Sequence, residues 1–337
     1  MGEAGLSEAV AEVQSAIDDA LRRVEQRFDV QLASDVPPVN SLCAHVGRYR
    51  GKMLRPTLVV ACGLAVGPGA NSASEALVVL GAVCEMVHMA TLVHDDVLDE
   101  ADVRRRGATL NRLRGNEAAV LMGDYLIASA YHLCSQLNDQ RYALLVGQTA
   151  MDLCAGELLQ LHHRSDWSID EATYFEILER KTGSLIGLAC RLGAMAAGAG
   201  PDLADRLDRF GRRVGIAFQI QDDVLDLIGN EQTIGKSVGR DLAKGKLTLP
   251  LIHMLGTLSS HDRGAALAAI ERLADAPDET SRAVIANLLV RSRAVEHAKG
   301  VAVGLVEEAK RELAALPESP AKRYLLRAAD AAVARAF

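Results

Sequence analysis

The chain carries a helical pattern of hydrophobic and polar residues along nearly its whole length. Alternation with a period of two residues, which would predict strands, is almost absent. In the first segment, apolar residues recur every three or four positions and form one stripe: Leu6, Val10, Val13, Ile17, Leu21 and Val24. The pattern predicts an all-α fold.

A helix-capping signal marks where one long helix is expected to begin. Ser72 with Glu75 has the spacing of a capping box, in which each side chain bonds a free backbone N–H of the first turn. The apolar pattern from there could continue past Asp99. At 1.5 Å per residue, about thirty residues would make a helix roughly 45 Å long. We therefore expect a helix long enough to cross a whole domain.

A second capping box and a helix break are predicted in the next part of the chain. Ser168 with Glu171 predicts a helical run that ends near Ala199, where Gly200-Pro201 interrupts the pattern. A further helix is expected from about residue 202. The predicted loops are 29–38, 67–71, 104–116, 164–167, 229–246 and 275–279. None is a long Ser/Gly-rich linker, so one all-α domain is expected over residues 1–337.

Composition narrows the class of protein. The 337 residues are 49% hydrophobic and 24% charged, which suits a globular protein with a large core. The net charge of −7 argues against nucleic acid as a partner. The acidic, amphipathic N-terminus is not a secretory signal. No apolar run is expected to span a membrane, because Arg191 and several glycines interrupt the best candidates.

The cysteines indicate the compartment. Six of them are scattered through apolar segments with no C-x-x-C pair: Cys43, Cys62, Cys84, Cys134, Cys154 and Cys190. They are interpreted as reduced core residues of a cytoplasmic protein.

One pentapeptide, Asp-Asp-Val-Leu-Asp, occurs twice, each time within an apolar helix. Asp95 and Asp99 lie four residues apart, on one helix face, and Asp222 and Asp226 repeat this relation. His88 precedes Asp95 by two turns on the same face. A single such run is most often a solvated acidic surface. If the two helices face each other, however, the carboxylates line one cavity and suit Mg²⁺ bound by oxygen ligands.

Basic segments lie near these motifs in the sequence. They are "GKMLRP" with Lys52 and Arg55, "VRRRGAT" with Arg104, Arg105 and Arg106, "ERKTG" with Lys181 and Thr182, and "IGKSVGRDLAKGKLTLP" with Lys236, Lys244 and Lys246. A solvated-surface interpretation is kept for Arg106, Arg240 and Lys244. Metal-binding carboxylates together with surplus cations predict a site for polyanions such as diphosphates.

These segments are similar to those of the trans-isoprenyl diphosphate synthases, or polyprenyl synthetases. The similar blocks, in order, are "GKMLRP", "EMVHMATLVHDDVLDEADVRRRGAT", "GNEAAVLMGDYL", "ERKTGSLIGLACRLGA", "FQIQDDVLDLIG" and "GKSVGRDLAKGKLTLPLI", from about residue 40 to 255. Two positions depart from the family's pattern: Met53, where many members carry Arg, and Arg106 before Gly107.

The resemblance implies a helical bundle around a central cavity, with the two Asp motifs facing each other across its mouth. An allylic prenyl diphosphate would bind there through Mg²⁺, as three ions, beside isopentenyl diphosphate in a metal-free basic pocket. The implied metal ligands are Asp95, Asp99 and Asp222, supported by Asp96, Asp223 and Asp226. The implied allylic-site residues are Arg104, Lys181, Thr182, Gln219 and Lys236, and the isopentenyl-site residues are Lys52, Arg55, His88 and Arg105.

The same resemblance assigns chemical roles. Lys181, Thr182 and Gln219 would surround an allylic cation formed when the diphosphate leaves. The glycines at 235, 239 and 245 make the segment 229–246 a candidate lid that excludes water. A homodimer is expected from the family.

Product length is predicted from residues one or two turns before the first Asp. Short-chain family members place Phe or Tyr four or five residues before it, whereas this chain has Ala90 and Thr91, with Val87 deeper. Small side chains also serve close helix packing. We nevertheless expect seven or more isoprene units, as in quinone side chains, with the floor near Cys134 or Val146.

Three alternatives stay open on the sequence alone. A class I terpene cyclase would need only one diphosphate pocket. A metal-dependent phosphohydrolase using His94-Asp95 would need further spaced histidines. A non-catalytic partner subunit would have lost metal or basic residues, and both Asp motifs are intact.

Overall fold

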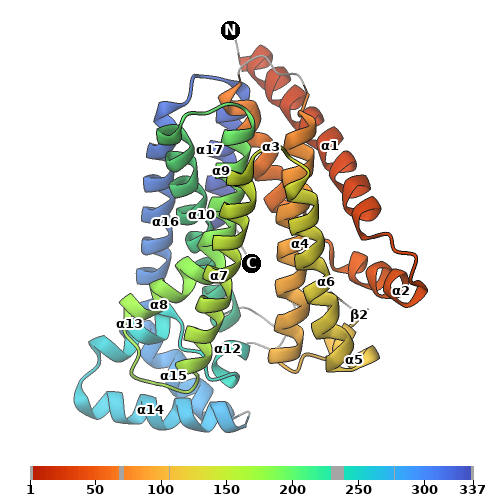
Figure 1. Ribbon diagram of the computed structural model, residues 1–337. Coiled ribbons are helices and arrows are strands. Elements are labelled where there is room, and N and C mark those ends of the chain that lie inside the picture. The colour runs from red at the N-terminus through yellow and green to blue at the C-terminus, as the bar shows by residue number, and fades with distance from the viewer. Residues whose placement is uncertain (1–2, 68–71, 106, 229–238, 277, 335–337) are drawn as a thin grey trace. The chain divides into compact units, whose positions relative to one another are not determined.

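The computed structural model describes residues 3–67, 72–105, 107–228, 239–276 and 278–334, and confirms the all-helical prediction (Figure 1). In this described part, the strands are two residues long: β1, Val103–Arg104, and β2, Gly107–Ala108. They pair antiparallel, with Val103 opposite Ala108.

The contacts divide the chain into two compact units. The first unit comprises Met1–Ala150, Leu185–Gly211 and Glu312–Leu326. The second comprises Met151–Ser184, Arg212–Arg311 and Arg327–Phe337. The organisation as a single domain over 1–337 stays a prediction.

The first unit is built around helix α4, Glu75–Leu98, which packs against α1, α3 and α6 (Figure 1). Its elements, besides β1 and β2, are α1 Glu3–Leu32, α2 Pro37–Val46, η1 Gly47–Tyr49, α3 Leu54–Val66, α4, α5 Leu110–Arg114, α6 Asn116–Ser135, α9 Ser184–Ala196 and η3 Leu313–Ala315, with parts of α7 Gln140–His162, α10 Pro201–Ile228 and α17 Pro320–Val333. In α9, a Cβ on Gly193 would lie 2.1 Å from the carbonyl oxygen of Val59 in α3. Only glycine permits this close approach of the two backbones.

The bounds of α4 correct the expected ones. Ser74, not Ser72, is the N-cap, because its hydroxyl is the one that accepts a hydrogen bond from the unpaired N–H of Leu77. The helix ends at Leu98, and Asp99 is its C-cap rather than an interior residue. The first Asp motif therefore lies at the end of a 24-residue helix.

The expectation that no apolar run approaches a membrane span is wrong for this helix. Residues 75–98 include an 18-residue window of mean hydropathy 2.0, long and apolar enough to cross a membrane. However, 78% of that window is buried within the protein. A helix surrounded by protein is apolar on all sides, so burial accounts for its composition.

The second unit holds the remaining helices. They are α8 Glu171–Leu178, η2 Glu179–Gly183, α12 Arg240–Ala243, α13 Leu249–Thr257, α14 Ser260–Asp275, α15 Glu279–Arg291 and α16 Ala294–Glu312, with the rest of α7, α10 and α17. The break at Gly200-Pro201 is confirmed, since α10 begins at Pro201.

Other sequence-based details need correction. Asp170 caps α8 in place of Ser168, accepting a 2.8 Å hydrogen bond from the backbone N–H of Thr173, because it directly precedes the helix. The expected loop 104–116 contains the β-hairpin and α5, and the described end of loop 229–246 contains α12. Cys154 is exposed and Cys43 partly exposed, so these two thiols are not core residues.

Candidate active site

The first Asp motif separates into two kinds of carboxylate. Asp95 and Asp99 are partly exposed at the end of α4, whereas Asp96 is only 1% exposed. The guanidinium of Arg104 holds Asp96 in a fork: Nε lies 2.9 and 3.0 Å from the two carboxylate oxygens, and Nη2 lies 2.8 Å from Oδ1. The structure thus pairs Asp96 with Arg104, while Asp95 and Asp99 lie at the solvent-accessible end of the helix. Neighbouring helical residues differ by about 100° in direction, which explains the separation.

The β-hairpin presents the next arginine to the segment before α3. Arg105 occupies the turn with a positive φ of 47° and is exposed. Its guanidinium lies over Gly51, where an added Cβ would meet Nη2 at 2.4 Å. Lys52 follows and is exposed. The hairpin therefore brings Arg105 beside Gly51 and Lys52, two of the positions in the first basic segment.

Three ionisable groups behind this hairpin perturb one another. Burial lowers the pKa of the Arg55 guanidinium and raises the pKa of the Glu85 carboxyl, which is 2% exposed. Burial also places the pKa of His88 well below its usual value, and the charges of Arg55, Arg105 and Arg104 lower it further. Arg55 Nε is buried without a hydrogen-bond partner. The cluster holds more positive than negative charge and suits an anion.

Met53 adds no positive charge to this cluster. It is 6% exposed, precedes α3 and has a left-handed backbone with φ of 53°. A buried thioether adds no charge, so the cations of the first segment are Lys52 and Arg55 alone.

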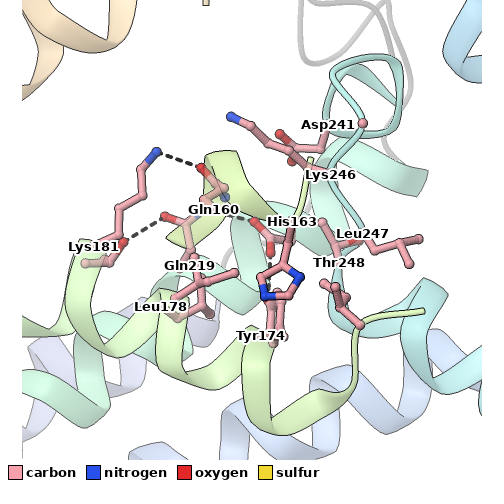
Figure 2. A pocket seen from close by; sticks show the side chains of 15 residues that line it. Gln160, His163, Tyr174, Leu178, Lys181, Gln219, Asp241, Lys246, Leu247 and Thr248 are labelled. Carbon is pink, nitrogen blue, oxygen red and sulfur yellow. Dashed lines mark hydrogen bonds between the residues drawn. The ribbon is translucent and has the colours of Figure 1, made fainter. Parts of the chain in front are cut away.

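In the second unit, Lys181 and Thr182 lie in a single π-helical turn, η2. Such turns insert an extra residue into a helix and frequently occur at functional sites. The Lys181 ammonium donates to Gln160 Oε1 at 2.9 Å and pairs with Glu157 (Figure 2). The Thr182 hydroxyl lies 3.5 Å from Gln219 Oε1. The structure therefore brings together the three residues expected around the allylic group.

The second Asp motif also has a buried middle carboxylate. Asp223 is 6% exposed and accepts hydrogen bonds from the Tyr174 hydroxyl at 2.6 Å and Gln219 Nε2 at 2.9 Å. Burial, and then the nearby charge of Asp241, raise its pKa to about 7, and the two hydrogen bonds oppose this rise. Asp222 and Asp226, one on each side, are partly exposed.

Helix α12 contributes a further carboxylate. The backbone N–H of Asp241 donates to Asp226 Oδ2 at 3.1 Å. Burial and then Asp226 raise the pKa of the Asp241 carboxyl, and Lys246 and Lys244 lower it. A cavity of about 110 Å³ is lined by Lys181, Thr182, Gln219, Asp223, Asp241 and Lys246, among others (Figure 2). This cavity combines carboxylates with ammonium groups, as a site for metal-bound phosphate requires.

Comparisons with known proteins agree with these motifs. The sequence model of the family described as polyprenyl synthetase matches residues 36–288. The chain belongs to the polyprenyl synthetase family. It is an enzyme, a prenyltransferase of the polyprenyl diphosphate synthase type, which overturns the cyclase, phosphohydrolase and non-catalytic alternatives.

Three relatives in this family illustrate its range. The nonaprenyl diphosphate synthase of Mycobacterium tuberculosis is 35% identical over 98% of this chain and 97% of its own. The geranylgeranyl diphosphate synthase of Methanosarcina mazei is 32% identical over 85% and 86%. A polyprenyl synthase from Caulobacter crescentus, solved with calcium and isoprenyl diphosphate, is 30% identical, with a TM-score of 0.87 over 97% of this chain and 98% of its own. Relatives thus make both long and short products.

The residues expected to set chain length in this family member lie inside the first unit. Val87 and Ala90 are each 1% exposed, and the Thr91 hydroxyl donates to the carbonyl of His88 at 2.7 Å. Lys236 and most of the expected lid lie outside the described residues.

Sequence reasoning missed several neighbours of the site: Gly51, Glu85, Gln160, Tyr174 and Asp241. Asp241 lies within the quoted block "GKSVGRDLAKGKLTLPLI", so its position beside the lysines was the available signal. No sequence pattern pointed to Tyr174 or Gln160, because each comes near the other site residues only when the chain folds.

Proposed function

We propose that this enzyme condenses isopentenyl diphosphate with an allylic prenyl diphosphate in an Mg²⁺-dependent reaction and releases diphosphate. One observation carries the proposal. In both Asp motifs the middle carboxylate is buried and held by its own partners, Asp96 by Arg104 and Asp223 by Tyr174 and Gln219. The outer carboxylates of each motif remain at partly exposed positions. The same construction occurs once in each unit, which supports a metal-binding role for both motifs.

The donor atoms fit Mg²⁺. Asp95, Asp99 and Asp222 offer only carboxylate oxygens, the ligands that Mg²⁺ prefers, and Mg²⁺ shares its remaining positions with water and phosphate. Bound Mg²⁺ would neutralise the charge of the leaving diphosphate. We propose three ions with substrate present. The Caulobacter relative was solved with calcium and isoprenyl diphosphate, which supports a site for both a divalent ion and a prenyl diphosphate.

Other side chains would bind the allylic diphosphate and stabilise the cation. Arg104, Lys181 and Lys236 would bind the allylic diphosphate. The carbonyl of Lys181, the Thr182 hydroxyl and the Gln219 amide would stabilise the cation formed as its C–O bond breaks. The isopentenyl double bond then forms the new C–C bond, and a proton passes to the departing diphosphate.

Isopentenyl diphosphate would bind at the cationic cluster of the first unit, on Lys52, Arg55, Arg105 and His88. The low pKa of His88 keeps its imidazole neutral, so it would contribute a hydrogen bond rather than charge. The surplus positive charge around Glu85 supports binding without a metal.

We further propose a long product of seven or more isoprene units, of the kind used in quinone side chains. The small Ala90 and Thr91 support this, because neither can close a tunnel for the growing chain. The similarity to a nonaprenyl diphosphate synthase supports a long product. Because a geranylgeranyl diphosphate synthase is also similar, the product length has to be measured on this enzyme.

A cytoplasmic homodimer is proposed as the working form. Helix α7 exposes Leu144, Met151 and Leu158 to 63%, 67% and 66%. Their seven-residue spacing forms an apolar stripe suited to a second copy of the same helix. The six cysteines are free thiols, which supports a reducing compartment. Sedimentation of wild type and Met151→Glu would test the dimer, since a charge on the stripe is expected to yield monomers.

Incubation with isopentenyl diphosphate, an allylic primer and Mg²⁺, followed by product chromatography, tests the reaction. Asp95→Ala and Asp222→Ala are each expected to abolish most turnover while the circular dichroism spectrum stays helical. Asp18→Ala, which changes an exposed carboxylate on α1, is the matched control. Near-normal turnover of either motif variant at saturating Mg²⁺ would refute the metal assignment.

A further inference from the structure

In the first unit, the segment that precedes α3 forms hydrogen bonds to the β-hairpin and to the helix that follows it. In η1, Tyr49 is 3% exposed, and its hydroxyl accepts a hydrogen bond from the backbone N–H of Leu110 at 2.8 Å. In α2, His45 Nε2 lies 3.1 Å from the carbonyl oxygen of Ala108. A carbonyl oxygen only accepts, so this nitrogen is the donor. Two side chains of one segment thus hold the end of β2 and the start of α5.

The Tyr49 hydroxyl takes the place of a helix cap. Leu110 is the first residue of α5, so its N–H has no acceptor within the helix. Thr109, the N-cap, makes no side-chain cap bond, because its hydroxyl donates to the carbonyl of Ala101 at 2.6 Å. The phenol of Tyr49, 61 positions away in the chain, supplies the acceptor that a buried N–H requires. Tyr49→Phe would leave this N–H buried without that acceptor.

The same tyrosine contacts the first Asp motif. The guanidinium carbon of Arg104 lies 5.9 Å from the centroid of the Tyr49 ring, within the range of a cation–π contact. Burial raises the pKa of the Tyr49 hydroxyl, and the charge of Asp96 and a hydrogen bond to it raise this pKa further. The hydroxyl therefore stays protonated and can donate to Asp96 while it accepts from Leu110. The His45 ring packs edge-on against Tyr49, with centroids 5.7 Å apart at 72°.

The β-hairpin depends on contacts of this kind. Its strands are two residues long, and an isolated hairpin is marginally stable at best in water. Arg105 in its turn has a φ of 47°, a conformation that is unfavourable for residues other than glycine and persists only where the surrounding structure fixes it. The Arg105 guanidinium lies over Gly51, in the same segment as the tyrosine. The segment before α3 therefore determines where the hairpin places Arg104 and Arg105.

We propose that Tyr49 and His45 are positioning residues that fix the β-hairpin so that Arg104 and Arg105 can bind their diphosphates. This inference rests on the proposed function, which assigns Arg104 to the allylic diphosphate and Arg105 to isopentenyl diphosphate. Tyr49 and His45 act through the two arginines and not by contact with substrate. A charged hydrogen bond to phosphate depends on geometry, so displacement of the hairpin weakens the binding of both substrates.

The first test is hydrogen–deuterium exchange of residues 107–114, from β2 through α5, measured by mass spectrometry. Tyr49→Phe keeps the ring beside Arg104 and removes only the hydroxyl. It is expected to speed exchange in this segment roughly three- to tenfold, as for one lost hydrogen bond, while exchange in α4 stays the same. Tyr125→Phe is the matched control, because its hydroxyl donates to the carbonyl of Leu32 at 3.4 Å and not to the hairpin. It is expected to leave exchange of residues 107–114 unchanged.

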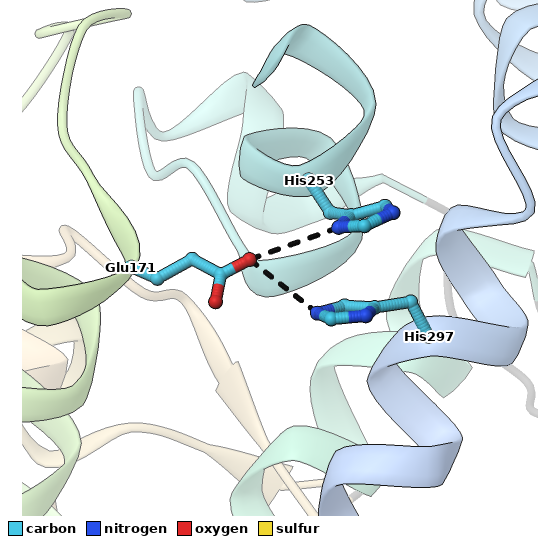
Figure 3. Close-up of side chains that lie close together, drawn as sticks. All are labelled: Glu171, His253 and His297. Atoms are coloured by element: carbon cyan, nitrogen blue, oxygen red, sulfur yellow. Dashed lines mark ion pairs between the residues drawn. The ribbon is translucent and has the colours of Figure 1, made fainter. Parts of the chain in front are cut away.

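The second test is steady-state kinetics. Tyr49→Phe and His45→Ala are each expected to raise KM for both diphosphates roughly three- to tenfold, with a smaller change in kcat. A merely structural role would lower the amount of folded enzyme, which lowers the apparent kcat and leaves KM unchanged. His297→Ala is the matched control for His45→Ala. This partly buried histidine lies beside Glu171 and His253 in the second unit, and its loss is expected to leave both KM values unchanged (Figure 3).

A double variant tests whether Tyr49 acts through Arg105. In the Arg105→Ala background, Tyr49→Phe is expected to leave KM for isopentenyl diphosphate unchanged, because the contact through which it acts is already lost. Unchanged exchange in Tyr49→Phe, wild-type KM values in that variant, or additive effects in the double variant would overturn the inference. Hydrogen exchange needs no turnover, so it tests the anchoring of the hairpin separately from the reaction. Absence of product from the wild type would refute the proposed function instead.

Discussion

The hydrogen bond between Tyr174 and Asp223 permits a quantitative test of how the second Asp motif is held. Tyr174→Phe removes the hydroxyl that donates to Asp223 Oδ2 at 2.6 Å and leaves the ring in place. Burial keeps the pKa of Tyr174 well above its usual value, so this hydroxyl stays a donor at all working pH values. After the change, Gln219 Nε2 still donates to this carboxyl at 2.9 Å.

The size of the effect depends on the charge of Asp223. A hydrogen bond between neutral groups contributes about 0.5–1.5 kcal/mol to the free energy of unfolding, and one to a charged group about 1.5–3 kcal/mol. The pKa of Asp223 is about 7, so the carboxyl is protonated at pH 5 and ionised at pH 9. Tyr174→Phe is therefore expected to destabilise the protein by about 0.5–1.5 kcal/mol at pH 5 and by about 1.5–3 kcal/mol at pH 9.

The pH dependence of the wild type follows from the same pKa. Asp223 has its pKa raised from 3.8 to about 7 by folding. Its contribution to stability is fully present below about pH 4 and is lost as pH rises through about 7. Without the tyrosine hydroxyl the ionised form loses about 1–1.5 kcal/mol more than the neutral form, so the pKa of Asp223 rises by about one pH unit.

The assay is urea unfolding of the metal-free protein, in chelator and reductant, at pH 5 and pH 9. Tyr125→Phe is the matched control, since its hydroxyl donates to the backbone carbonyl of Leu32 at 3.4 Å and not to a carboxylate. Its effect is expected to be the same at both pH values. An equal loss for Tyr174→Phe at pH 5 and pH 9, or a larger one at pH 5, would refute the reasoning.

Four further substitutions test other parts of the site. Arg105→Ala is expected to raise KM for isopentenyl diphosphate more than KM for the primer, and Lys181→Ala is expected to do the reverse. Each rise is expected to be roughly ten- to a hundredfold, because a lost charged contact costs about 1.5–3 kcal/mol. Equal effects on both substrates would mean that the two pockets are misassigned. Gly51→Ala is expected to displace the Arg105 guanidinium, whose Nη2 would lie 2.4 Å from the new Cβ, and to raise the same KM without loss of helicity; an unchanged KM would remove Arg105 from the isopentenyl site. Ala90→Phe is expected to shorten the product while the first condensation continues; an unchanged product distribution, or a wild-type product no longer than geranylgeranyl diphosphate, would contradict the chain-length assignment.

Much of this protein could be predicted from local sequence. Helical periodicity depends on residues three and four positions apart, so the all-α fold and the break at Gly200-Pro201 could be predicted from the sequence pattern. The repeated Asp motifs and the basic segments were recognisable because their chemistry is carried by short, contiguous patterns. Capping residues were placed two positions early, because two neighbouring hydroxyl or carboxyl groups compete for the same turn and only packing selects one.

The partners of the site residues were decided by tertiary structure. The resemblance to the family made Asp96 and Asp223 supporting residues of the metal ligands, but it could not reveal that each is buried and held by a separate side chain. Tyr174 lies 49 positions from Asp223, and nothing in the local pattern of either residue encodes the other. Glu171, His253 and His297 come from three separate helices and form no motif. Such clusters depend on how helices pack, and packing is set by the sum of many weak contacts across the core rather than by any short segment.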